Sequence, residues 1–261
     1  MPSANTPMMI AAGLIFLMFV AVETGWRVGK RRQRIDAKGA HTGVAAADSA
    51  IFALFGLLIA FTFSGAAQRF DARRHLVVEE TNAIGTAWLR IDTLAPEDQP
   101  ALRAQFREYL AIRVQAYKLF RDLPAAFAEL DRAARMQDAI WKTAMDAGRR
   151  EGYQQANMIL LPALNQMFDI VTTRTAAMQF HPPQIIFAML FVLAVASSLL
   201  VGDAMSAARS RPWLHMFAFV IVTACAIYVI VDLEYPRLGL IRVDATDRLL
   251  EDLLKNMTTK P

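Results

Sequence analysis

The sequence predicts an all-α integral membrane protein: four transmembrane helices, a helical extramembrane region inserted between the second and the third, and a second helix that extends beyond the membrane. The 261 residues are 55% hydrophobic and 20% charged, which is too apolar for an ordinary soluble domain and too charged for a wholly embedded one. The two kinds of residue are also separated along the chain. No period-two alternation lasts long enough to predict a sheet.

Four apolar segments are candidates for membrane spans, because about 20 apolar residues in a helix cross the hydrocarbon core. Between the second and the third lies a long polar region. The first segment lacks the basic start and the cleavage site of a secretory signal, so we expect it to be a retained helix. The segments are residues 8–22, 49–67, 185–201 and 213–231.

The second apolar segment continues without a break into an amphipathic stretch, so we expect one long helix that leaves the membrane. Apolar residues at every seventh position predict a packed face on this extension, at Phe70, Val77, Ile84 and Ile91. The opposite face is polar and can meet water, a partner chain or a polar channel. It carries Arg69, Asp71, Arg73, Arg74, Glu79, Glu80 and Asn82.

The polar region is expected to be helical throughout, with further helices over about residues 97–121, up to 147, and from 152 onwards. Proline and glycine residues separate these helices. The predicted organisation divides the chain into residues 1–68 with transmembrane helices 1 and 2, 69–182 with the extramembrane region, 183–235 with transmembrane helices 3 and 4, and 236–261 as a C-terminal tail.

The distribution of charge argues against a nucleic-acid partner. The formal net charge is +4, but the basic residues do not form one patch. A basic cluster that begins at Arg27 directly follows the first apolar segment, which is typical of a topological anchor against anionic lipid on the cytoplasmic side. The single cysteine, Cys225, excludes an internal disulfide and a multi-cysteine metal site.

No catalytic, cofactor-binding or metal-binding set emerges from the sequence, so we expect neither an enzyme nor a cofactor. The histidines lack metal-ligand spacing, and there is no glycine-rich phosphate loop or nucleophile elbow. Acidic residues at membrane edges, such as Asp232 and Glu234, are more informative, because an ionisable group near hydrocarbon is costly unless it is paired or hydrated. They fit structural ion pairs or an ion pathway, and the sequence leaves both open.

Three runs of residues resemble the bestrophin-like membrane proteins, a bacterial domain of unknown function remotely related to the bestrophin ion channels. The resemblance covers about residues 10–250. The runs are FTFSGAAQRFDARRHLVVEETNAIGTAWLR, LPALNQMFDIVTTRTAA and DLEYPRLGLIRV, in this order around the four membrane helices.

True bestrophins are homopentameric and usually anion-selective channels whose second membrane helix lines an apolar neck. The resemblance therefore implies a homo-oligomer, a pentamer if the likeness extends that far, that conducts ions, with anions expected, around the second transmembrane helix. By the same resemblance, the neck candidates are Phe55, Ile59 and Phe63. Vestibule residues that would attract ions are Arg69, Arg73, Arg74, Glu80 and Asn82.

The segment after the last membrane helix looks like its bestrophin counterpart and supplies the clasp candidates Asp232, Glu234, Pro236 and Arg237. The long acidic run of the calcium-regulated animal members is missing here. The resemblance therefore does not carry a metal site over to this chain.

Two questions stay open at the level of the sequence. The chain is expected to be a multi-pass protein of the inner (cell) membrane, with itself, lipid and ions as its partners. The first question is its function, because a membrane-anchored interaction or sensor module without transport is the alternative to a channel. The basic loop predicts an N-terminus and an extramembrane region outside the cytoplasm, whereas the bestrophin resemblance implies the reverse.

Overall fold

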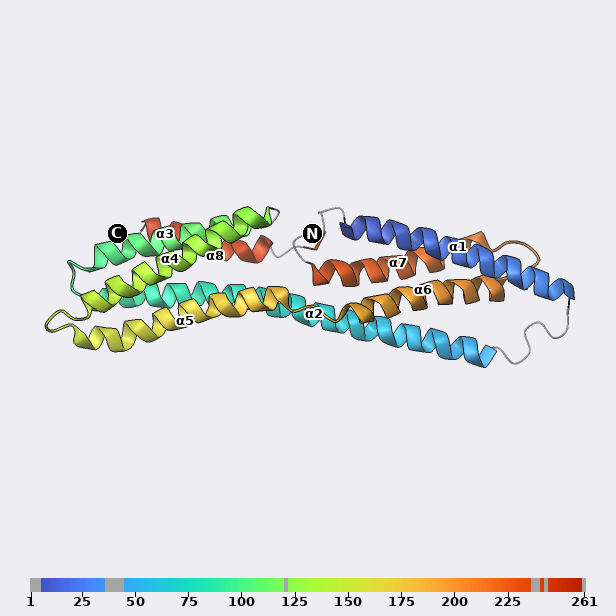
Figure 1. Ribbon diagram of the computed structural model, residues 1–261, viewed down its shortest axis with the longest axis horizontal. Helices are drawn as coiled ribbons and strands as arrows, with labels where there is room; N and C mark the ends of the chain where they lie inside the picture. Colours follow the sequence, from blue (N-terminus) through green and yellow to red (C-terminus); the bar gives the residue numbers. More distant parts are fainter. Residues whose placement is uncertain (1–5, 36–44, 120–121, 236–239, 242–243, 260–261) are drawn as a thin grey trace. The chain divides into compact units, whose positions relative to one another are not determined.

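The computed structural model describes residues 6–35, 45–119, 122–235, 240–241 and 244–259, and within them the fold is entirely helical. The predicted all-α class is thereby confirmed (Figure 1). The helices, in chain order, are α1 (Thr6–Ile35), α2 (Ala45–Arg90), the 3₁₀ helix η1 (Ile91–Thr93), α3 (Gln99–Lys118), α4 (Leu123–Ala147), α5 (Gln154–Gln179), α6 (Gln184–Met205), α7 (Trp213–Glu234) and α8 (Asp244–Thr259).

Four helical stretches, in α1, α2, α6 and α7, are long and apolar enough to cross a membrane, as expected. The helix that begins at Ala45 is continuous to Arg90, so the predicted long second helix is also present. Helix α1 extends to Ile35, well beyond its apolar segment. Lysine and arginine are good helix formers, so the basic run continues the helix instead of ending it.

The chain forms two compact units, and α2 contributes to both. The membrane unit comprises residues Met1–Phe70 and His181–Ile241, and the polar unit comprises Asp71–Phe180 and Arg242–Pro261. Each unit has its own hydrophobic core.

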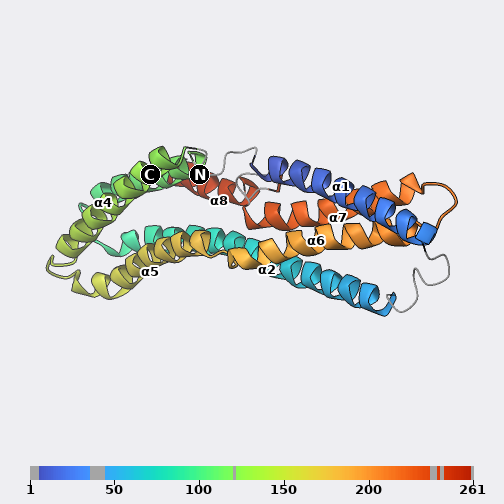
Figure 2. The same cartoon turned by 45° about the vertical axis from the view of Figure 1, so that its right-hand side comes forward.

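Helices α1 and α6 of the membrane unit lie side by side in Figures 1 and 2, and two glycines allow their backbones to touch. A Cβ atom at Gly25 would overlap the backbone carbonyl of Leu199, and one at Gly202 would overlap that of Val22. Small residues at such positions let membrane helices gain van der Waals contact where the hydrophobic effect gives little drive. Helix α7 adds Met216 and Val220 to the same core.

The polar unit is built on the predicted stripe of α2. Val77, Ile84 and Ile91 are all buried and pack with residues from α3, α4 and α5, while Phe70 is half-buried in the membrane unit. In both Figure 1 and Figure 2, α5 runs along the second half of α2. Gly152 takes a φ of 86° in the turn before α5, a backbone conformation that glycine adopts without strain.

The C-terminal segment contains a helix that the sequence analysis leaves out. Helix α8 packs against α3, burying Leu250 and Met257 in the core of the polar unit. Lys118 and Glu251 add an ion pair at 2.8 Å. Its apolar residues recur at helical spacing, which is the signal that could have revealed it.

Replacing Gly202 with alanine is expected to destabilise the membrane unit. The added methyl group meets backbone atoms that cannot rotate away, and such overpacking costs about 1–3 kcal/mol. The matched control is Gly13→Ala on α1, where a Cβ has open space and alanine favours the helix by about 0.5–1 kcal/mol. Thermal unfolding in detergent should lower the Tm of the Gly202 variant only. Equal melting temperatures for both variants would contradict the close α1–α6 contact.

Candidate functional site

Helix α2 is the least covered of the four membrane-spanning helices. In its most apolar 18-residue segment, only 11% is buried within the chain. The corresponding share is 28% for α1, 28% for the stretch containing α6 and 39% for α7. Large apolar side chains stand exposed along this half of the helix. They are Leu54, Leu57, Phe61 and Phe63.

Among the many exposed residues of α2, one series recurs at every seventh position along the helix and is exposed at each member. Seven residues fall about 20° short of two full turns, so the six members of this series lie within an arc of about 100° around the helix axis. The side chains on this stripe, all exposed, are Leu54, Phe61, Gln68, His75, Asn82 and Leu89. We call this set the exposed stripe. Its members are apolar at Leu54 and Phe61, polar at Gln68, His75 and Asn82, and apolar again at Leu89.

The three residues that the resemblance marks as a neck do not share one environment. Phe55 is 5% exposed and belongs to the core of the membrane unit, Ile59 is half-buried, and Phe63 is 46% exposed. A spacing of four residues turns about 40° per step, so the set rotates by about 80° around the helix axis. Phe63 falls in the same seven-residue series as the buried Val77, whereas Phe61 belongs to the exposed stripe.

Arg69 and Glu234, predicted separately as a vestibule residue and a clasp residue, form one ion pair. Arg69 donates from Nε to both carboxylate oxygens at 3.1 and 2.9 Å, and its Nη2 lies 2.8 Å from Oε2. His181 Nδ1 lies 3.0 Å from Oε1 of the same buried carboxylate, and its ring stacks on Tyr235. A paired and fork-shaped contact of this kind fixes α2 to α7 and offsets the arginine charge.

Asp232 closes a turn instead of facing a pathway. Its buried carboxylate accepts hydrogen bonds from the backbone N–H of Leu240 at 3.0 and 3.1 Å and of Ile241 at 2.8 Å. It thus holds the chain that follows α7 back against the end of that helix. The other two clasp candidates, Pro236 and Arg237, lie outside the described residues.

The two remaining vestibule arginines are also engaged within the chain. Arg73 is buried and donates to the carbonyl oxygens of Ala177 at 3.2 Å and Phe180 at 3.1 Å. Those carbonyls end α5, where unpaired acceptors favour a cation. Arg74 is exposed and lies 3.5 Å from Asp71.

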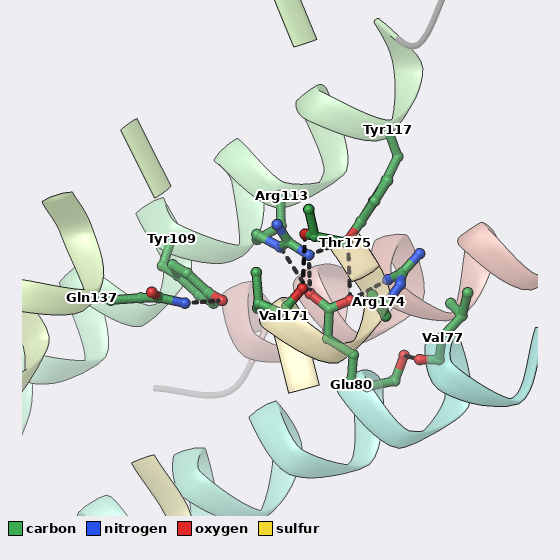
Figure 3. Close-up of polar contacts among 10 residues, drawn as sticks. Val77, Glu80, Tyr109, Arg113, Tyr117, Gln137, Val171, Arg174 and Thr175 are labelled. Carbon is green, nitrogen blue, oxygen red and sulfur yellow. Dashed lines mark hydrogen bonds and ion pairs between the residues drawn. The ribbon is translucent and has the colours of Figure 1, made fainter. Parts of the chain in front are cut away.

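Glu80 is the centre of a buried polar cluster that joins α2, α3 and α5 (Figure 3). Arg113 approaches Glu80 Oε1 at 2.8 Å through both Nε and Nη2, Arg174 Nη1 binds Oε2, and Tyr117 donates to Oε2 at 3.1 Å. The Nη2 group of Arg113 also donates to the hydroxyl of Tyr117. Glu80 was predicted to attract ions, but a carboxylate held by two guanidinium groups in a core has a structural role.

The electrostatics of this cluster follow from its burial. Burial alone would raise the pKa of the Glu80 carboxyl, but the charges of Arg113 and Arg174 hold the pKa below its usual value. Glu80 lies more than three helical turns beyond Ala67, the last residue of the apolar segment. Burial also raises the pKa of Tyr109 to about 12, so this phenol stays neutral and accepts a hydrogen bond from Gln137 at 3.1 Å.

The neighbouring residue Glu79, rather than Glu80, reaches the surface. Glu79 and Asn82 border a groove between α2 and α5, whose other polar lining residues include Asn165, Gln166 and Asp169. The vestibule candidates include Asn82 but not Asp169 of α5, which lines the same groove. Among the described residues, no group of three or more His, Cys, Asp or Glu side chains is placed to hold a metal ion.

Comparison with known proteins matches the chain to one family. The model of a Bestrophin-like domain matches residues 10–247. A crystal structure of a bacterial Bestrophin homolog from Klebsiella pneumoniae is similar with a TM-score of 0.69 and 16% identity, covering 95% of this chain and 99% of that one. A structure described as a membrane protein gives a TM-score of 0.70, with the same identity and coverage. A search of curated proteins finds no match.

Glu80→Gln is expected to lower the free energy of unfolding by about 3–5 kcal/mol, because two buried guanidinium groups lose their carboxylate. The adjacent Glu79→Gln is the matched control and should change stability by no more than about 0.5 kcal/mol, since that side chain is exposed. Thermal unfolding in detergent measures both variants. Equal losses would show that the cluster does not hold the core together.

The same variant should alter the acid sensitivity of folding. The pKa of Glu80 is lower in the folded state, so its contribution is complete above its ordinary pKa of 4.5 and disappears as the pH falls through the folded value. Unfolding measured from neutral to acidic pH should therefore be less steep for Glu80→Gln than for the wild type.

Proposed function

Because the chain belongs to the bestrophin-like family, we propose that it is an ion channel of the inner (cell) membrane, formed by a homo-oligomer around α2. The observation that carries this proposal is the low burial of the apolar half of α2, of which 11% is covered within one chain. Copies related by a rotation axis would each contribute this helix to a common centre. A membrane anchor alone would leave the apolar half of this helix to lipid, and it gives no role to the exposed polar side chains Gln68, His75 and Asn82 that follow it.

The exposed stripe is the part of α2 that faces the axis in this proposal. Leu54 and Phe61 would form the apolar constriction, which excludes water when narrow, and Gln68, His75 and Asn82 would line a wetter route beyond it. Phe63 would then face a neighbouring subunit or lipid. This arrangement replaces the neck of Phe55, Ile59 and Phe63 with a neck built from the exposed stripe.

The charges beside the stripe favour cations as the permeant ions. Asp71 and Glu79 are exposed and lie about 40° around the helix from His75, whereas Arg74 lies about 100° away and beside Asp71. Arg69 donates to Glu234 and Arg73 donates to backbone carbonyls. Acidic groups along a route raise the local cation concentration. We therefore propose cation preference in place of the anion preference that the resemblance implies.

The constriction is tested by single-channel recording in planar bilayers. Phe61→Ala should raise the conductance severalfold, while Phe63→Ala, the same change two residues away, should leave it near the wild-type value. A rise for Phe63→Ala alone would favour the neck implied by the resemblance and contradict the exposed stripe. Wild-type protein that never conducts in several salts and over a wide voltage range would contradict the channel itself.

Selectivity is tested by the reversal potential across a salt gradient. Glu79→Gln should shift this potential away from the cation equilibrium value, because it removes a charge beside the exposed stripe. Glu151→Gln, an exposed acidic residue in the turn before α5, is the matched control and should leave the potential unchanged. A wild-type reversal potential near the anion equilibrium value would overturn the cation preference.

A further inference from the structure

One end of the membrane unit gathers basic side chains from two segments that lie far apart in the sequence. The segments are the last turns of α1 and the connection between α6 and α7. We call their basic side chains the basic rim. The basic rim consists of Arg27, Lys30, Arg31, Arg32, Arg34, Arg209 and Arg211.

Direct contacts place the two segments together. Lys30 Nζ donates to the carbonyl oxygen of Ala208 at 3.0 Å, and Gln33 Nε2 donates to Ser206 Oγ at 3.0 Å. Arg211 donates to Glu23 Oε1 at 3.2 Å. The rim is therefore one surface, made by the tertiary fold, and not only a run of basic residues on one helix.

Trp26 lies at the centre of this surface. The guanidinium carbon of Arg211 lies 3.9 Å from its ring centroid, and Lys30 Nζ lies 5.7 Å from it. Trp26 Nε1 is buried and has no hydrogen-bond partner among the described residues. The exposed Trp213 lies beside the same arginine, with its ring centroid at 5.4 Å. Tryptophan and cationic side chains in this combination are typical of the interface between lipid tails and headgroups.

The rim has an excess of positive charge. Among the residues that the structure describes here, two carboxylates lie next to these basic side chains, those of Glu23 and Asp203. Glu23 is bound by both Arg27 and Arg211, and Asp203 lies 3.5 Å from Arg32. The exposed side chains of Arg31 and Arg34 add further positive charge. Such a surface attracts anions, and at the end of a membrane helix the phosphate of an anionic lipid is the anion close at hand.

We propose that the basic rim binds the headgroup of an anionic phospholipid at Trp26. Lys30 and Arg211 supply the charge that holds the phosphate, and the ring of Trp26 lies beside both cations. Arg31 and Arg34 extend the attraction to neighbouring headgroups. The residues of this site lie on α1 and on the connection between α6 and α7, so lipid binding here does not depend on whether the protein is a channel.

The proposal is tested with the full-length protein in detergent by native mass spectrometry. The probes are phosphatidylglycerol, phosphatidylcholine with the same acyl chains, and inorganic phosphate. Wild-type protein should retain phosphatidylglycerol in preference to phosphatidylcholine. Lys30→Gln with Arg211→Gln should weaken that retention roughly fivefold for each charge removed. Trp26→Ala removes the aromatic ring beside these two cations and should also weaken it.

Two controls separate lipid binding from folding and from general charge. Arg31→Gln with Arg34→Gln alters exposed side chains, so it should reduce retention while the Tm stays unchanged. Arg149→Gln with Arg150→Gln removes two charges from the polar unit and should have no effect. Equal retention of both lipids by the wild type would overturn the proposal. Binding of inorganic phosphate without lipid preference would identify a free-phosphate site instead and would likewise overturn it.

Discussion

The structure depends on one constraint. The single 46-residue helix α2 packs into both hydrophobic cores, and it does so with the same side. Phe55, Val77 and Ile84 are buried, whereas Phe61 and His75 are exposed. Because a helix turns by about 100° per residue, the buried positions share one side of α2 and the exposed stripe lies on the other. Burial of one side leaves the other uncovered, and an uncovered apolar side in a membrane protein needs lipid or further copies of the chain.

Most of the buried or half-buried charges of α2 are paired with groups of the same chain. Arg69 binds Glu234, Arg73 binds the carbonyls that end α5, and Glu80 is held by arginines from α3 and α5. These contacts anchor α2 to its neighbours at three points over about three turns. The exposed charges that remain near the exposed stripe are those of Asp71, Arg74 and Glu79, and the cation preference that we propose rests on this balance.

The two units use different physical means of packing. In the membrane unit, Gly25 and Gly202 bring α1 and α6 into backbone contact, as is useful where apolar side chains gain little from leaving lipid. In the polar unit, large side chains such as Phe106 and Tyr109 fill a water-excluded core around the Glu80 cluster. The same close approach of α1 and α6 aligns their ends, which brings Lys30, Trp26 and Arg211 into one surface.

The sequence by itself determined the helical class, the four apolar spans, the continuity of α2 and the buried series through Val77 and Ile84, because period and hydropathy are local properties of the chain. It also singled out Arg69 and Glu234, but not that they pair, and it could not separate Glu79 from Glu80. Only the tertiary structure decided these points. A residue's role depends on which side chains from other helices surround it, and two adjacent residues on a helix point about 100° apart, so one meets two arginines in a core while its neighbour meets water.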